Sequence, residues 1–198
     1  MATERNFRKK IKTPFGIAEF PWLNKPDTKF GGEAYKVTIR IKGDEATKFY
    51  NEMLEMAGVA LAQQKKADPD NYKKVKSLGK LFIEPAEDED GDVLADEYLV
   101  KAKTNRFYQY NGEEYENTIN IVDMDKQEVT QSVYSGSELR AIVTIKPYSG
   151  FGGGLSAQIN AVQVRNLVTG GGGDDLDFDD GFGEVEAQAE GDADDDDF

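Results

Sequence analysis

The sequence predicts a mainly β fold: an antiparallel barrel of five to six strands with one capping helix, followed by a disordered acidic tail. Apolar and polar residues alternate with a period of two in several segments between residues 13 and 167, while one segment shows helical spacing. The composition changes sharply near residue 170, at a run of four glycines. We therefore expect a folded domain over residues 1–169 and a flexible tail over residues 170–198.

The clearest strand signal runs from Tyr35 to Lys42, where Tyr35, Val37, Ile39 and Ile41 share one face. The sequence predicts further strands over residues 13–23, 97–110, 114–123, 138–146 and 155–167. The inward positions expected in the last two are Leu139, Ala141, Val143, Ile145, Ile159, Ala161, Val162 and Val164. Asn111-Gly112 is a residue pair that type I′ turns prefer, so residues 97–110 and 114–123 should form a hairpin.

One helix interrupts the strands. We expect Asp44 to cap it and Asp68-Pro69-Asp70 to end it. Apolar residues recur between them at spacings of three and four: Phe49, Met53, Met56, Ala57, Ala60 and Leu61. The oligonucleotide-binding (OB) fold is the commonest small barrel with one such helix, and an unrelated β-sandwich is the alternative.

The chain has no cysteine and no histidine, which excludes disulfides, thiolate metal sites and histidine-based catalysis. We expect neither an enzyme nor a cofactor. Met1 to Lys12 is charged and lacks the apolar stretch of a signal peptide, and no apolar run approaches the roughly 20 residues of a membrane span. These features favour a soluble, cytoplasmic protein.

The net charge of −14 is concentrated in the predicted tail. Residues 171–198 contain 13 acids and no basic residue, which leaves 25 acids against 24 lysines and arginines in the rest of the chain. The body is therefore nearly neutral, and an anionic partner such as nucleic acid is compatible with it.

Cations and aromatic rings recur together on the polar faces of two predicted strands and in the glycine-rich segment 146–154. Cations replace counterions on phosphates, and rings stack on unpaired bases without reading their sequence. A solvated sheet face is the alternative interpretation of the lysines, as a solvated chain end is of the basic arm from Arg5 to Lys12. The candidate nucleic-acid-binding residues are Lys36, Arg40, Lys42, Lys101, Lys103, Arg106, Tyr108, Lys146, Tyr148 and Phe151.

Three acidic features suggest other functions. Residues 86–97 match an EF-hand calcium loop in part, but alanine occupies its first position, so an acidic surface turn is the better interpretation. Asp123, Asp125 and Glu128 could serve a metal-dependent nuclease, although acids are common in such turns. The acidic total suggests an interaction protein or a mimic of DNA, which would spread its carboxylates over the folded body.

The tail closes with Asp194, Asp195, Asp196, Asp197 and Phe198. An apolar ring beside a carboxylate can dock in a hydrophobic pocket with a basic rim on a partner protein.

Taken in order, several motifs resemble the single-stranded DNA-binding proteins of short-tailed phages of the T-seven type. They include residues 15–19 (FGIAE), 25–27 (KPD) and 35–37 (YKV). They continue with residues 119–122 (INIV), 136–139 (GSEL), 146–148 (KPY), the glycine-rich hinge and the acidic end.

This resemblance implies an OB-fold core and non-specific binding that protects and anneals single strands in phage DNA replication, recombination and repair. It also implies homodimers in the host cytoplasm. The tail would contact the phage DNA polymerase and primase–helicase.

Overall fold

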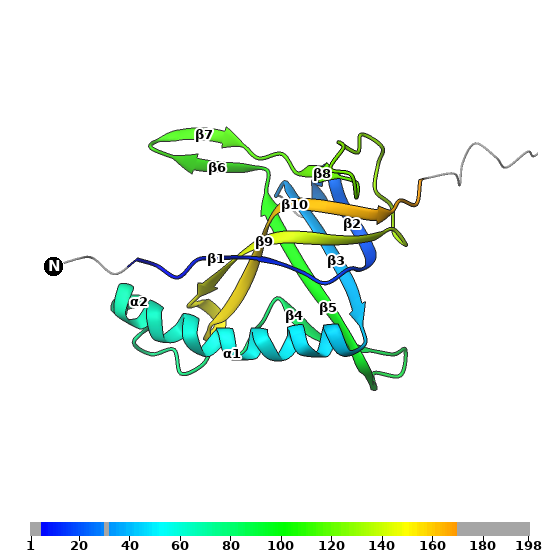
Figure 1. The fold of residues 1–198 in the computed structure, drawn as a ribbon. Coiled ribbons are helices and arrows are strands. Elements are labelled where there is room, and N and C mark those ends of the chain that lie inside the picture. Colours follow the sequence, from blue (N-terminus) through cyan, green and yellow to red (C-terminus); the bar gives the residue numbers. More distant parts are fainter. Residues whose placement is uncertain (1–4, 30–31, 170–198) are drawn as a thin grey trace, which may run out of the picture.

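β-strands dominate the computed structural model, which describes residues 5–29 and 32–169, and one main helix packs beneath them (Figure 1). The mainly β class with one capping helix is confirmed. The predicted tail, residues 170–198, lies outside the described residues. The elements are β1 Lys9–Lys12, β2 Gly16–Asp27, β3 Ala34–Lys42, α1 Asp44–Ala67, α2 Pro69–Tyr72, β4 Ile83–Glu87, β5 Val93–Asn105, β6 Phe107–Tyr110, β7 Glu113–Glu116, β8 Asn120–Val122, β9 Glu138–Tyr148 and β10 Gly154–Asn166.

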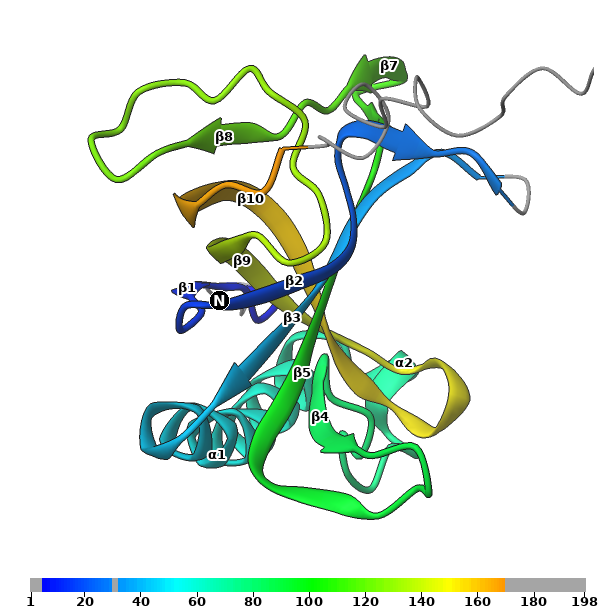
Figure 2. The same ribbon diagram turned by 90° about the vertical axis from the view of Figure 1, so that its right-hand side faces the viewer.

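The main sheet has eight strands in the described part of the chain, in the order β4-β5-β3-β2-β9-β10-β8, with β1 paired to β9 (Figure 2). All of its ladders are antiparallel except the short β8–β10 pairing, which is parallel. The predicted barrel of five or six strands thus becomes a larger OB-like sheet, and its ladder does not close among residues 5–29 and 32–169. The short strands β1 and β4 supply the additional members, and they are too brief for a periodicity signal. The predicted strand over residues 114–123 divides into β7, which pairs in the hairpin, and β8, which joins the main sheet.

Side-chain alternation builds the core as predicted. Tyr35, Val37, Ile39 and Ile41 of β3 are buried, and so are the four predicted inward residues of β9. In β10 the register slips at Asn160, so that Ile159 and Val162 are buried while Ala161 is only half-buried. A bulge of one residue shifts the alternation, which makes the prediction for Ala161 wrong.

Helix α1 packs against β3, β4, β5 and β9 and buries one face. Its start differs from the prediction, because Gly43 is the N-cap residue and Asp44 is the first residue of the helix. Gly43 has φ 87°, a left-handed conformation that glycine adopts at little cost, so the chain enters the helix one residue early. Asp68 ends α1 as predicted and caps α2. Neither described helix has the length and apolar composition of a membrane span.

The predicted hairpin is confirmed in a shorter form. Asn111 and Gly112 have φ values of 52° and 85°, as a type I′ turn requires, and they join β6 to β7. The predicted strand over residues 97–110 breaks at Arg106, whose backbone N–H donates to the Glu33 carbonyl. The hairpin therefore forms a separate two-stranded sheet that projects beyond the main one (Figure 1).

A buried hydroxyl joins β5 and β10, two strands that are not paired in the ladder of the main sheet. Thr104 of β5 is 3% exposed, and its Oγ1 donates to the Ile159 carbonyl of β10 over 2.9 Å. We expect Thr104→Val to lower the free energy of unfolding by about 1–2 kcal/mol in urea denaturation, because the Ile159 carbonyl loses its donor. Thr144→Val is the matched control: its hydroxyl donates to Asn160 at the surface, so its effect should stay within about 0.5 kcal/mol. Equal effects of the two substitutions would contradict a bridging role for Thr104.

Candidate nucleic-acid interface

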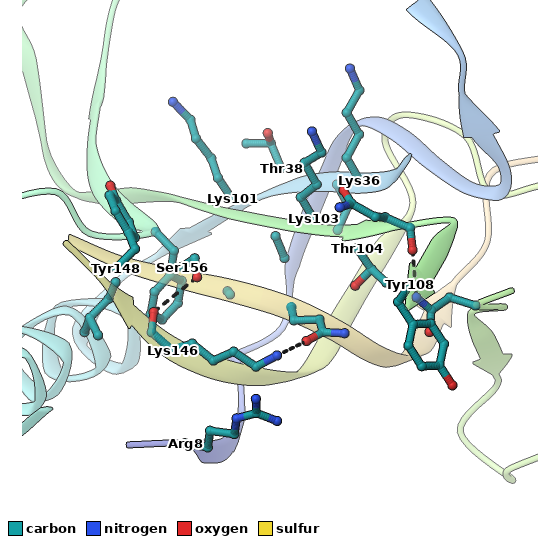
Figure 3. A pocket seen from close by; sticks show the side chains of 18 of the residues that line it. Arg8, Lys36, Thr38, Lys101, Lys103, Thr104, Tyr108, Lys146, Tyr148 and Ser156 are labelled. Carbon is teal, nitrogen blue, oxygen red and sulfur yellow. Dashed lines mark hydrogen bonds between the residues drawn. The ribbon is translucent and has the colours of Figure 1, made fainter. Parts of the chain in front are cut away.

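A groove of about 1390 Å³ crosses the sheet between β3 and β5 on one side and β9 and β10 on the other (Figure 3). The described residues that line it include no carboxylate, although the chain is acidic overall. Their cations are Arg8, Lys36, Lys101, Lys103 and Lys146. An anionic ligand would therefore meet only positive or neutral groups along its walls.

The outer face of β3 and β5 carries three of these cations. In the antiparallel register Lys36 lies directly opposite Lys103, and Thr38 lies opposite Lys101. Like charges in direct cross-strand pairs disfavour folding. Asp27, which is buried, forms an ion pair with Lys36, and its hydrogen bond from that lysine is the main reason that the pKa of Asp27 is lowered.

The other cations differ in how far they are paired. Lys101 forms an ion pair with Glu84 in which both side chains are about half exposed, so the pair contributes little to stability and can open. In residues 5–29 and 32–169, neither Lys103 nor Arg8 takes part in an ion pair. These two groups are the most available for phosphate.

The N-terminal arm places Arg8 in the groove. The Phe7 ring is buried, and its backbone N–H donates to Oε1 of Gln64 on α1 over 2.9 Å. Gln64 in turn donates to Asn6 over 3.0 Å. Strand β1 then pairs with β9 from Lys9 onward, so Arg8 is held from both sides.

Lys146 lies on the floor of the groove near Arg8 (Figure 3). Its ammonium donates to Oε1 of Gln158. Burial, and to a lesser degree the neighbouring Arg8 charge, lower the pKa of Lys146. A phosphate placed between these two groups would raise the pKa of Lys146 again, because a nearby opposite charge favours the charged form of the lysine.

Aromatic rings lie at both ends of the groove. Figure 3 shows Tyr148 at one end and Tyr108 at the other, with Lys101 and Lys103 between them. The Tyr108 ring stacks on Tyr115 across the hairpin with centroids 5.6 Å apart. Tyr148 lies over Gly154, where any Cβ would collide with the tyrosine ring and with the Lys80 carbonyl. The glycine is therefore required for the position of this ring.

Six of the ten predicted binding residues line the groove: Lys36, Lys101, Lys103, Tyr108, Lys146 and Tyr148. The other four do not. Arg40 binds Glu19 and Glu97, and Arg106 binds Glu33 and Glu116, which raises the pKa of both guanidinium groups. Lys42 is exposed outside the groove. Phe151 is 92% exposed beside Lys80.

Sequence reasoning missed several residues of the groove, among them Arg8 and Phe20. Arg8 belongs to the basic arm, where nothing in the sequence distinguishes it from its neighbours; the signal would have been the apolar Phe7 before it. Phe20 lines the groove although strand alternation assigns it to the core. Its signal was Pro21, because a proline within a strand marks an edge or a bulge.

The acidic alternatives are accounted for by local turns. Asp88 Oδ1 accepts from the backbone N–H groups of Asp90 and Asp92. Asp123 Oδ1 accepts in the same way from Asp125 and Gln127. Each carboxylate thus stabilises the turn that contains it.

The lowered pKa of Lys146 gives a testable pH dependence. The folded protein releases this proton more readily than the unfolded chain, so between the folded pKa and the unfolded value near 10.5 the unfolded state binds more protons. Stability relative to Lys146→Met should therefore rise as the pH increases toward 10.5 and then level off. Urea denaturation of both proteins between pH 7 and about 11 would measure the difference. A difference that falls with pH would show that Lys146 is stabilised in its charged form.

Comparisons with known proteins bear on the fold. No family model matches this sequence, and no curated protein does. Among solved structures, gp2.5, a single-stranded DNA-binding protein encoded by bacteriophage T7, is similar with a TM-score of 0.64 and 20% identity, over 90% of this chain and 100% of that one. The single-stranded DNA-binding protein of bacteriophage Enc34 matches as a C-terminal truncation (TM-score 0.53, 17% identity) and in complex with single-stranded DNA (0.52, 18%), each over 80% of this chain and 87% of the other. The chain therefore has the fold of these phage single-stranded DNA-binding proteins, and the resemblance drawn from the sequence is confirmed at the level of the fold.

Proposed function

We propose that this protein binds single-stranded DNA along the groove without sequence preference. The observation that carries the proposal is a groove with five cations, exposed rings at its rim and no carboxylate among its described lining residues. Such cations release counterions from a phosphate backbone, and such rings stack on any base. The same fold in proteins whose structures are described as single-stranded DNA-binding supports the assignment.

The groove favours a single strand over a duplex because its aromatic rings need base faces. In a duplex these faces are stacked on neighbouring pairs, so only the phosphates remain for the protein to contact. Tyr108, Tyr110 and Phe107 are all at least 40% exposed and line the groove. The free energy of stacking is therefore available only to unpaired bases.

The alternative of an acidic interaction protein or DNA mimic is disfavoured by where the acids lie. A mimic presents carboxylates on its binding surface, whereas the groove presents lysines. The wider roles that the resemblance implies belong to this proposal: protection and annealing of single strands in phage replication, recombination and repair. Homodimer formation stays a prediction of the resemblance.

The electrostatic part of the proposal can be tested with two lysines on neighbouring strands. Lys103→Gln removes a groove cation, while Lys42→Gln removes an exposed cation outside the groove. We expect Lys103→Gln to weaken oligo(dT) binding and to lower the salt slope by about 0.7, the contribution of one phosphate contact on a single strand. Lys42→Gln should change neither. Fluorescence anisotropy at several salt concentrations measures both quantities.

The wild-type protein should bind oligo(dT) more tightly than a duplex of equal length in the same assay. Equal affinity for the two forms, or affinity that ignores salt, would refute single-strand binding through this groove.

We further propose that residues 194–198 recruit replication proteins, namely a phage DNA polymerase and a primase–helicase. The proposal rests on the sequence of four aspartates followed by Phe198. A partner pocket with a basic rim would accept the carboxylates, and its apolar floor would accept the ring.

This recruitment predicts a separation of two activities. Phe198→Ala removes the docking ring but no side-chain charge, so it should abolish capture of the polymerase and leave oligo(dT) affinity unchanged.

Deleting residues 174–198 should also tighten oligo(dT) binding at low salt, because 13 tethered carboxylates no longer compete with DNA for the groove. Pull-down of the polymerase and anisotropy titrations measure the two effects. Undiminished capture by Phe198→Ala would rule out the ring as the docking group, and unchanged DNA affinity after the deletion would rule out competition.

A further inference from the structure

Strand β2 contains a bulge beside the groove. From Glu19 to Trp22 this strand advances three residues, while its partner β3 advances only two, from Thr38 to Lys36. The extra residue lies between these pairs, at Phe20-Pro21. Bulges of this kind change the direction in which a side chain points.

The bulge turns Phe20 out of the core. Ala18 on the same strand is fully buried, and strict alternation would place Phe20 on the same inner face. Instead Phe20 is 77% exposed and lines the groove, whose wall here includes Lys36 and Thr38 of β3. A large apolar ring is thus held in solvent next to a cation, although the core lies on the other face of the same strand.

The backbone of Phe20 has an unfavourable conformation. Its φ is 48°, in the left-handed region that residues with a bulky side chain rarely adopt. The following Pro21 disfavours the left-handed conformation of Phe20 further, because a proline biases the preceding residue toward extended conformations. Strain of this kind persists where surrounding contacts impose it, and it clusters at functional sites.

The segment from Ser135 to Ser137 imposes the conformation. The Phe20 backbone N–H, which is the extra donor of the bulge, donates to Ser135 Oγ over 3.0 Å. On the inner side of the bulge, Ala18 donates to the Ser137 carbonyl over 2.8 Å and accepts from Gly136 over 2.9 Å. Three hydrogen bonds from a segment more than 100 residues away therefore fix the bulge.

We infer that Phe20 is a base-stacking residue of the groove, held in its exposed position by the bulge of β2 and by Ser135. The inference rests on the proposed single-strand binding and adds a contact to it. Phe20 lies on β2 between the residues that pair with Thr38 and Lys36, and both Phe20 and Lys36 line the groove, so one nucleotide can place its base on the ring and its phosphate near the ammonium. Because an aromatic face accepts any base, the contact contributes affinity and no sequence preference.

The test compares two ligands and four variants of the full-length protein. The ligands are oligo(dT) and an abasic deoxyribose-phosphate strand of the same length, which keeps the phosphates and lacks the bases. Phe20→Ala should weaken oligo(dT) binding on the order of tenfold, leave abasic binding unchanged and leave the salt slope unchanged. Phe20→Trp should retain or improve oligo(dT) affinity. Tyr134→Ala is the matched control, because Tyr134 is 47% exposed and outside the groove.

Phe20→Gly distinguishes a loss of DNA affinity from a loss of stability. Glycine accepts the left-handed backbone, so this variant should keep or raise the thermal midpoint while it loses oligo(dT) affinity. Equal weakening on both ligands would show that Phe20 only shapes the groove, and unchanged oligo(dT) affinity would show that it does not touch the DNA; either result overturns the inference. Failure of the wild-type protein to bind oligo(dT) would overturn the proposed function as well.

Discussion

The antiparallel register of β3 with β5 determines both which residues form the core and where the groove cations lie. Nine consecutive pairs, from Ala34↔Asn105 to Lys42↔Glu97, join the two strands. Because successive side chains point to opposite faces, the same register that places Ile39 and Ile41 in the core places Lys36 and Thr38 in the groove. A slip of one residue would bury lysines and expose the core, so the hydrophobic free energy that stabilises the fold also fixes the position of the cations.

Lysine and arginine have different tasks in the described domain. Arg40 and Arg106 each bind two carboxylates, and their planar guanidinium groups lock neighbouring segments together. Four of the five groove cations are lysines, which are flexible point charges with three donors. A phosphate backbone of variable conformation suits such charges better than a rigid fork does. Apart from Arg8, the groove therefore presents flexible lysines, while Arg40 and Arg106 serve the structure.

The sequence was sufficient for the elements whose periodicity is long. The alternation of residues 35–42 and 138–146 predicted both strands and their buried faces, and the spacing in residues 44–67 predicted the helix. The short strands β1 and β4 were not predicted, because four or five residues carry too little pattern. Arg40 and Arg106 were predicted as binding residues because a sequence cannot show that distant glutamates, such as Glu97 and Glu33, will neutralise them. Phe20 was not predicted as a groove residue, because alternation along β2 places it on the core face. The bulge turns its side chain to the opposite face.

The N-terminal arm has a consequence for how the protein is made. Arg8 reaches the groove only when Phe7 is docked on Gln64 and β1 is paired with β9, a strand that begins 126 residues beyond β1 at Glu138. Lys146, Tyr148 and Gln158 emerge from the ribosome later still. A nascent chain that has exposed only its first 130 residues therefore lacks one wall of the groove and the strand that orders the arm. Such long-range pairing is slow to form. The groove is completed only by β9 and β10, which are synthesised after the other strands that line it.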